Sequence, residues 1–380
     1  MRRGEPGAVL SAGPPGGRRR VVGWLVASVL VAACTAGFAA LDLPSPLLFG
    51  AVVGSMAYAV FGTGRRIGAL GTLPTLTLPR RAPIVGQAVI GVSIGALIDP
   101  TTLRELAGST GAAIAVAGLA TLAVSIVSGW VFARVGGLSA ATGVFSMIAG
   151  GASGITAIAR ELGADDRVVS VIQYVRVLLI LVGMPVVAAL VFRPEHTGAV
   201  LVTGGSASWV VSLAYVVGCG VVGTYVGTAL RLPAGALLGP LAVAIGVGLL
   251  VASRTSIALG VPDLVLSFGY VLIGAYVGLR FTPTTLRSIA RLLPAAIGLI
   301  VAVIVVSAGL GVLLARVTGQ SALDGYLATT PGGLYAVLAT AVDAGADVTF
   351  VLAVQVIRLV IMLAAAPLLS RVLRPGPGRR

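Results

Sequence analysis

The chain has 380 residues, of which 57% are hydrophobic and only 10% charged, and this composition excludes a soluble enzyme, because a soluble fold needs charged residues on nearly every element. The 26 basic residues outnumber 12 acidic ones and give a formal net charge of +14. All are arginines, and most stand singly or in pairs between apolar runs, so they do not form the single basic face that nucleic-acid binding requires. We therefore expect a polytopic membrane protein in contact with the lipid bilayer, without a nucleic-acid partner.

Metal and disulfide chemistry lack the necessary residues. Cys34 and Cys219 each lie inside an apolar run, and His196 is far in sequence from any cluster of metal ligands. We expect no disulfide, no metal, no cofactor and no enzymatic activity.

Twelve apolar runs follow an N-terminal segment, residues 1–20, that we expect to be a disordered cytoplasmic tail rich in arginine, proline and glycine. Runs of about 20 apolar residues have the length of a membrane-spanning helix. The first run is too long for a typical signal-peptide core, and we expect it to be the first span. The runs are 21–41, 47–61, 83–98, 111–132, 138–159 and 168–192 in the first half, and 207–230, 236–252, 264–279, 293–315, 321–341 and 348–369 in the second.

Two tandem repeats organise the chain. The sequence Pro-Thr-Thr-Leu-Arg occurs at 100–104 and again at 283–287, and three glycines precede it in both halves. The three glycines are separated by four and then three intervening residues, as Gly-x4-Gly-x3-Gly. Further matches pair Gly-Gly at 150–151 with 332–333 and Gly-Ala-Asp at 163–165 with 345–347. We expect homologous transmembrane repeats at 21–206 and 207–375, followed by a short cytoplasmic tail at 376–380. The paired glycines are Gly86, Gly91 and Gly95 with Gly269, Gly274 and Gly278, which favour helix packing.

The fifth run of each half contains small residues that should interrupt a helix. The cluster is Ala-Gly-Gly-Ala-Ser-Gly at 149–154 in the first half and Thr-Thr-Pro-Gly-Gly at 329–333 in the second. Proline lacks an amide hydrogen, and glycine is a poor helix former. We expect both elements to be broken and re-entrant.

The positions of the arginines favour an inverted arrangement of the two repeats. Arginine-rich loops stay in the cytoplasm, and five full spans in each half place more loop arginines there than six spans do. The sequence therefore predicts an all-α protein with ten spans, two re-entrant helices and both termini in the cytoplasm, with twelve spans as the alternative. Inverted repeats around broken helices are typical of secondary transporters.

A glutamine and an arginine recur on one helix face near the end of each repeat. Gln173 and Arg176 are three residues apart, and Gln355 and Arg358 repeat the pattern. Arg176 follows Asp165 by about 16 Å of helix, which places it near the middle of the bilayer. An arginine at this depth is costly and indicates a functional role. The alternative is a structural arginine that satisfies carbonyl groups freed at the broken helices.

The glycine clusters are the second candidate for a binding site. A half-helix that begins after such a cluster would aim free N–H groups at an anion, although small residues also let membrane helices pack closely. Neighbouring hydroxyl groups would supply neutral hydrogen bonds. Besides the two Gln/Arg pairs, the predicted substrate-binding residues are Gly150, Gly151, Ser153, Thr330, Gly332, Gly333 and Tyr335.

The acidic residues point away from a carboxylate relay. Asp165 and Asp347 stand at the start of the last helix of each half, where a carboxylate caps exposed amides. Buried arginines without buried acids favour an anionic solute, with any coupling ion held by backbone carbonyl groups. The sequence leaves the oligomeric state open. The other acids considered, all at span ends, are Asp42, Asp99, Asp263 and Asp324.

The repeated pattern Gly-Gly…Gly-Ala-Asp-x7-Gln-x2-Arg-x8-Pro, with Gly-Gln-Ala-Val-Ile-Gly at 86–91 upstream, resembles the AbrB-type family of duplicated bacterial membrane proteins. The resemblance covers nearly everything after residue 40. Members are labelled ammonia monooxygenase or regulator of gene expression, and the family is similar to inverted-repeat antiporter and anion transporter folds. A monooxygenase would need a metal or another oxygen-activating cofactor, for which this chain offers no ligand set.

This chain departs from the family pattern at one place. The pattern often continues from Pro-Gly-Gly to a Glu-Met pair, whereas this chain has Gly154-Ile155 in the first half and Ala336-Val337 in the second. We expect a secondary transporter of a small anionic solute in the bacterial cytoplasmic membrane, with its site at the interface of the repeats. The alternative is a membrane-embedded regulator or sensor without transport.

Overall fold

The computed structural model describes residues 17–63, 72–97, 110–148, 164–192, 207–232, 234–254, 259–281 and 289–372. Most of the predicted N-terminal tail, the whole C-terminal tail and the first glycine cluster, with Gly150, Gly151 and Ser153, lie outside these ranges.

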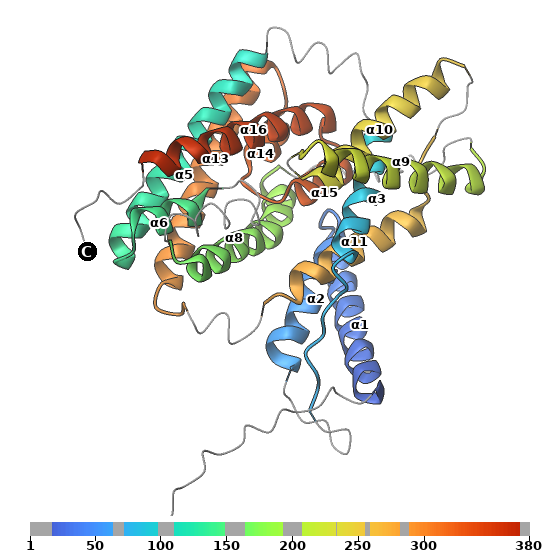
Figure 1. Cartoon of the computed structure of the whole chain (residues 1–380), viewed down its shortest axis with the longest axis horizontal. Helices are drawn as coiled ribbons and strands as arrows, with labels where there is room; N and C mark the ends of the chain where they lie inside the picture. The colour runs from blue at the N-terminus through green and yellow to red at the C-terminus, as the bar shows by residue number, and fades with distance from the viewer. Residues whose placement is uncertain are drawn as a thin grey trace, which may run out of the picture.

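The described residues form helices joined by short connections (Figure 1). Two of the helices end in a π-helical turn. In chain order the elements are α1 (Gly17–Ala40), α2 (Pro46–Ala57) with η1 (Tyr58–Gly62), α3 (Ala82–Leu97), α5 (Gly111–Gly136), α6 (Ala140–Met147), α8 (Asp166–Val187) with η3 (Ala188–Phe192), α9 (Trp209–Ala229), α10 (Gly235–Ala252), α11 (Asp263–Gly278), α13 (Leu293–Thr318), α14 (Ala322–Thr329), α15 (Leu334–Asp343) and α16 (Val348–Val372).

The helices form two lobes, which Figure 1 shows on the right and on the left. Lobe A contains α1, α2, α3, α9, α10 and α11, and lobe B contains α5, α6, α8, α13, α14 and α16. The short helix α15 lies between them, in contact with α16 and α14 of lobe B and with α3 of lobe A. Each lobe contains helices from both halves of the chain.

The two halves interleave within lobe A. Helix α3 packs against α10, and α11 packs against α2. A Cβ atom at Gly91 of α3 would overlap the carbonyl oxygen of Leu237, and one at Gly274 of α11 would lie 2.6 Å from the carbonyl oxygen of Leu48. The predicted glycine stripes are therefore packing surfaces, because the backbones approach closely where a side chain is missing.

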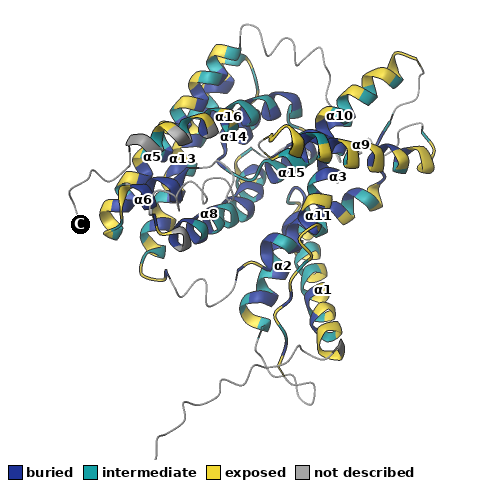
Figure 2. Ribbon diagram, viewed as in Figure 1, coloured by how far each residue is buried: buried dark blue, intermediate teal, exposed yellow. Residues whose placement is uncertain are grey.

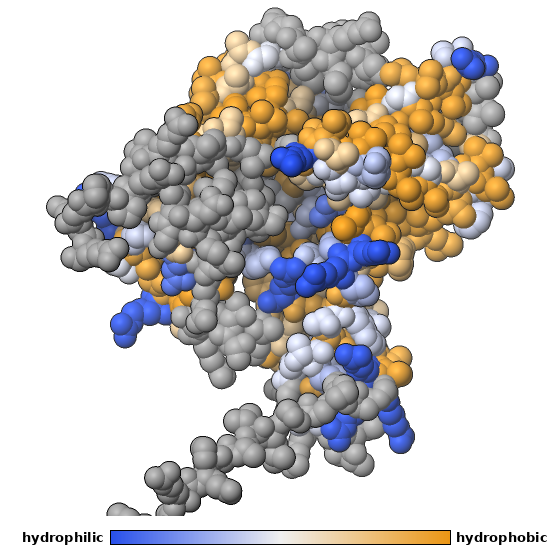
Figure 3. Space-filling model, viewed as in Figure 1, coloured by the Kyte–Doolittle hydropathy of each residue, from blue (hydrophilic) through white to orange (hydrophobic). Residues whose placement is uncertain are grey.

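The surface and the helix lengths are those of a helical membrane protein. Within the described ranges, six helices are long and apolar enough to cross a membrane. Their outward faces are exposed in Figure 2, and apolar residues cover the region of α9 and α10 in Figure 3. Val221 and Leu250 are 67% and 61% exposed, as expected for contact with lipid. The six helices are 18–40, 111–136, 168–192, 209–229, 235–252 and 293–318.

The predicted interruption in the second half lies between α14 and α15. Helix α14 ends at Thr329, and α15 begins at Leu334. Pro331 has no amide hydrogen with which to continue the helix, and the N–H of Gly332 donates to the carbonyl of Thr330 at 2.8 Å. In the first half, α6 ends at Met147, immediately before the part of the chain that the structure does not describe. We call residues 330–333 the α14–α15 break.

Close packing at a glycine of α10 gives a stability prediction. A Cβ atom at Gly239 would overlap the carbonyl oxygen of Gly223 in α9, whereas nothing lies within 4 Å of a Cβ atom at Gly246 in the same helix. Gly239→Ala should lower the free energy of unfolding by about 1–3 kcal/mol, the cost of overpacking. Gly246→Ala should be neutral or stabilising by up to about 1 kcal/mol, since alanine is the better helix former. Thermal unfolding in detergent measures both, and equal melting temperatures would contradict the packing.

Candidate functional site

The Gln/Arg pair of the first half binds the end of a short helix. Gln173 and Arg176 lie on α8 and face the C-terminus of α6. Gln173 Nε2 donates to the carbonyl of Phe145 at 2.9 Å, and Arg176 Nη1 donates to the carbonyl of Met147 at 2.9 Å. The last carbonyl groups of a helix have no partner within it. The two side chains are buried and supply hydrogen-bond donors to carbonyl groups at the end of α6.

The pair of the second half does the same for α14. Gln355 Nε2 donates to the carbonyl groups of Leu327 at 2.9 Å and Thr330 at 3.1 Å. Arg358 Nη1 donates to Thr329 at 3.0 Å and Thr330 at 2.8 Å, and its Nη2 donates to Gln355 Oε1 at 2.7 Å. The structural role that the sequence left as an alternative is thus present in both pairs.

Aspartates at the start of α8 and α16 fix where these helices begin. Asp165 Oδ1 accepts a hydrogen bond from the N–H of Val168 at 3.1 Å, and Asp347 Oδ1 accepts one from Phe350 at 3.0 Å. Each carboxylate therefore satisfies an amide of the first turn, which a helix cannot satisfy itself.

A second set of hydrogen bonds ties each long helix to its short neighbour. The N–H of Asp165 donates to Thr142 Oγ1 of α6 at 3.0 Å, and the N–H of Asp347 donates to Asp324 Oδ1 of α14 at 2.7 Å. Asp324 also completes a capping box with Ser321 and is buried. The sequence placed Asp324 only at a span end, whereas its carboxylate holds α14 and α16 together.

The two buried arginines retain positive charge that their partners do not neutralise. Every hydrogen bond that the guanidinium groups of Arg176 and Arg358 make within the described residues goes to a carbonyl or amide oxygen. The Nε atoms of both are buried without an acceptor. A neutral acceptor satisfies a hydrogen bond but leaves the charge uncompensated.

Helix dipoles do not cancel this charge. The amide N–H groups of Gly333, Leu334 and Tyr335 at the start of α15 have no acceptor among the described residues. A helix N-terminus carries about half a positive charge, and the C-termini of α6 and α14 carry about half a negative charge each. The two arginines contribute about +2, the N-terminus of α15 about +0.5 and the two C-termini together about −1, which leaves a net charge of about +1.5. The arrangement is suited to a buried anion.

The remaining predicted residues surround the α14–α15 break in different ways. The hydroxyl group of Thr330 donates to the carbonyl of Tyr326 at 2.6 Å, so its carbonyl rather than its hydroxyl serves the arginine. A Cβ atom at Gly332 would lie 2.8 Å from Ile180 Cγ2 of α8, and the ring of Tyr335 lies 3.2 Å from the place of a Cβ atom at Gly333. The glycines of the break are therefore packed closely against Ile180 of α8 and Tyr335 of α15.

Two groups of polar residues between the lobes were missed by sequence reasoning. Ser45 Oγ donates to Asp343 Oδ2 at 2.6 Å, which joins the start of α2 to the end of α15. Arg280 donates through Nη1 to the phenol of Tyr174 and through Nη2 to that of Tyr276. The four-residue spacing of Tyr276 and Arg280 was a usable signal for one of these contacts.

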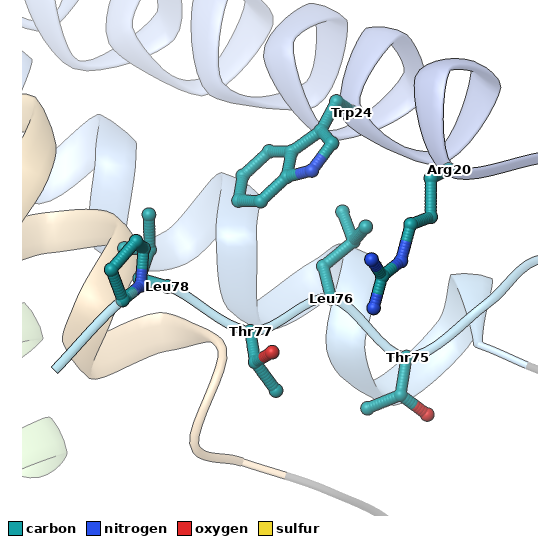
Figure 4. Close-up of a pocket in the computed structure, with 7 residues that line it drawn as sticks. Arg20, Trp24, Thr75, Leu76, Thr77 and Leu78 are labelled. Atoms are coloured by element: carbon teal, nitrogen blue, oxygen red, sulfur yellow. The ribbon is translucent and has the colours of Figure 1, made fainter. Parts of the chain in front are cut away.

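A separate cavity of about 280 Å³ lies between the start of α1 and the extended segment 72–79. Figure 4 shows Arg20 and Trp24 of α1 beside Thr75, Leu76 and Thr77 of that segment. None of the predicted site residues lines it. No group of three histidine, cysteine, aspartate or glutamate side chains in the described ranges could hold a metal ion.

These features define the class of protein to which the chain belongs, namely helical membrane proteins; the described part contains one broken helix and two buried arginines. The model of the family described as "Transition state regulatory protein AbrB" matches residues 66–374. The Escherichia coli (strain K12) protein "Putative regulator AbrB" is 31% identical over 354 residues, 92% of this chain and 96% of that protein. The Bacillus subtilis (strain 168) "Uncharacterized protein YhjN" is 26% identical over 375 residues, covering 94% and 89%. The chain belongs to the AbrB family.

The buried carboxylate of Asp324 gives a second stability prediction. Asp324→Ala would leave the N–H groups of Asp347 and Ser321 without this acceptor, and each buried unsatisfied donor costs about 1–3 kcal/mol. Asp324→Asn keeps an acceptor oxygen and should lose less. Asp263→Ala is the control, because Asp263 is an exposed first-turn residue of α11. Melting temperatures in detergent should fall in the order Asp263→Ala, Asp324→Asn, Asp324→Ala, and any other order contradicts the assigned role.

Proposed function

We propose that this protein is a secondary transporter of a small organic anion. The observation that supports the proposal is the pair of buried arginines, Arg176 and Arg358, whose partners in the described part of the chain are all neutral oxygens. A buried charge without a counterion is expensive, and an anionic solute would supply the counterion. Such a protein binds and moves its solute without catalysing a reaction.

The anion would lie at the α14–α15 break. There the Nε–H groups of both arginines and the amides of Gly333, Leu334 and Tyr335, which have no acceptor among the described residues, are available as donors. A guanidinium group can bind a carboxylate through two parallel hydrogen bonds, which favours an organic acid. The Nη1 atoms would meanwhile keep their contacts with the short helices and hold the arginines in place.

The two-lobe architecture favours transport over binding alone. The break immediately precedes α15, which contacts α3 of lobe A and α16 of lobe B. A site between two bodies can open to one side or the other when they move, and broken helices at such a site are a recurring plan of transporters. We propose ten spans in two inverted repeats, two re-entrant helices, and both termini on the cytoplasmic side of the inner membrane. A coupling ion would bind to backbone carbonyl groups.

A regulator or sensor without transport is the second candidate. The Escherichia coli relative carries the name of a regulator, and a protein that binds an anion and signals its presence would also use buried arginines. The two candidates differ in whether the anion crosses the membrane. Binding without uptake would favour the sensor.

Purified protein in liposomes tests the arginines. Arg176→Gln and Arg358→Gln should reduce uptake of radiolabelled carboxylates by at least about tenfold, because a charged hydrogen bond contributes about 1.5–3 kcal/mol. Arg176→Lys and Arg358→Lys keep the charge but lose the planar fork, so they should bind more weakly than wild type. Normal uptake by the glutamine variants would show that the arginines are not the anion site. Variants absent from the membrane would favour the purely structural role.

Cysteine labelling tests the topology. In a background without Cys34 and Cys219, single cysteines replace Thr102 and Thr285, which occupy the same place in the two repeats. An impermeant maleimide on intact cells should label Thr102→Cys but not Thr285→Cys, since inversion places the second site in the cytoplasm. Labelling of both cysteines would contradict the inverted arrangement and favour twelve full spans.

A further inference from the structure

The contact between the lobes includes an exposed arginine held by two tyrosines. Arg280 follows the end of α11 in lobe A, and its Nη1 atom donates to the phenol of Tyr174 on α8 in lobe B. Its Nη2 atom donates to Tyr276, one turn earlier on α11. The guanidinium carbon lies 5.4 Å from the ring centre of Tyr174 and 4.5 Å from that of Tyr276. Both terminal nitrogens therefore have neutral partners, and the group remains exposed.

Helix α8 connects this arginine with the α14–α15 break. Tyr174 and Ile180 both lie on α8, about 9 Å apart along the helix axis, and Ile180 Cγ2 lies 2.8 Å from the place of a Cβ atom at Gly332. The ring of Tyr335, in the first turn of α15, packs against Gly333, whose N–H has no acceptor among the described residues. The exposed Arg280 and the buried break are thus joined through one helix.

The phenols are replaceable partners for the guanidinium group. A phenol oxygen is a neutral acceptor, whereas a carboxylate accepts two charge-assisted hydrogen bonds from the same two nitrogens and binds about twice as strongly. A carboxylate that reaches Arg280 would displace both hydroxyl groups. The tyrosine rings beside it would then provide flat, apolar surfaces for the body of the ligand.

We propose that Arg280, Tyr174 and Tyr276 form an outer subsite that captures an organic carboxylate with an apolar body before it passes to Arg176 and Arg358. The inference rests on the proposed transport function and adds an entry site to it. Displacement of the Tyr174 hydroxyl would also break a contact between lobe A and lobe B. Capture of the ligand would thus loosen the two bodies that must move.

The test measures uptake of [14C]acetate and [14C]benzoate by protein in liposomes. Arg280→Gln should raise the concentration of benzoate at half-maximal uptake by about tenfold, because it removes charge-assisted hydrogen bonds. The maximal rate should change little, since the buried site is intact. Arg280→Lys should raise this concentration by about threefold, because lysine keeps the attraction but cannot bind the carboxylate through two parallel hydrogen bonds. Benzoate should half-saturate wild type at a lower concentration than acetate.

Arg134→Gln is the matched control. Arg134 is also exposed and lies over an aromatic ring, 3.8 Å from the ring centre of Trp130, but it stands on α5, away from the break. The Arg134→Gln variant should therefore take up both acids like wild type. If Arg280→Gln behaves like Arg134→Gln while wild type transports, the outer subsite is wrong and the proposed function stands. If Arg280→Lys half-saturates at the same benzoate concentration as wild type, Arg280 acts by charge attraction alone, and the proposed subsite is wrong. Wild-type protein that takes up neither acid overturns both proposals.

Discussion

The structure depends on the need to satisfy carbonyl groups at helix ends that are buried in an apolar interior. A membrane offers no water for such groups, and α6 and α14 both end inside the protein. The donors come from α8 and α16, through Gln173 and Arg176 in one half and Gln355 and Arg358 in the other. The positions of the short helices, the break and the long helices are all set by these bonds.

An arginine brings a positive charge into the interior, and this charge is not needed to satisfy the carbonyl groups. Glutamine alone donates two hydrogen bonds to Leu327 and Thr330 without bringing a charge into the interior. Arg358 makes comparable bonds and adds a full positive charge, with one nitrogen left without an acceptor. Under the proposed function, the same arginine would support the end of a short helix and bind the anion. The structural and functional interpretations of the arginines therefore do not exclude each other.

Local patterns predicted much of the fold and part of the site. The interruption at 329–333 follows from proline and glycine, and the capping aspartates at the start of α8 and α16 were found where the sequence placed them. Contacts between the lobes could not be predicted, because they depend on tertiary packing. Tyr174 and Arg280 are 106 residues apart, and Ser45 and Asp343 are 298 apart. The burial of Asp324 was also missed, because a helix start in the sequence does not reveal what lies beside it.

The interleaving of lobe A has a consequence for how the chain is made. Helices α2 and α3 pack closely at glycine residues against α11 and α10, which are synthesised roughly 220 and 150 residues later, respectively. A chain emerging from the ribosome at about 5–20 residues per second would hold the first pair without its partners for roughly ten seconds or more. During that interval their small-residue faces remain in lipid. Lobe A therefore becomes complete only after α11, which ends at Gly278, has been synthesised.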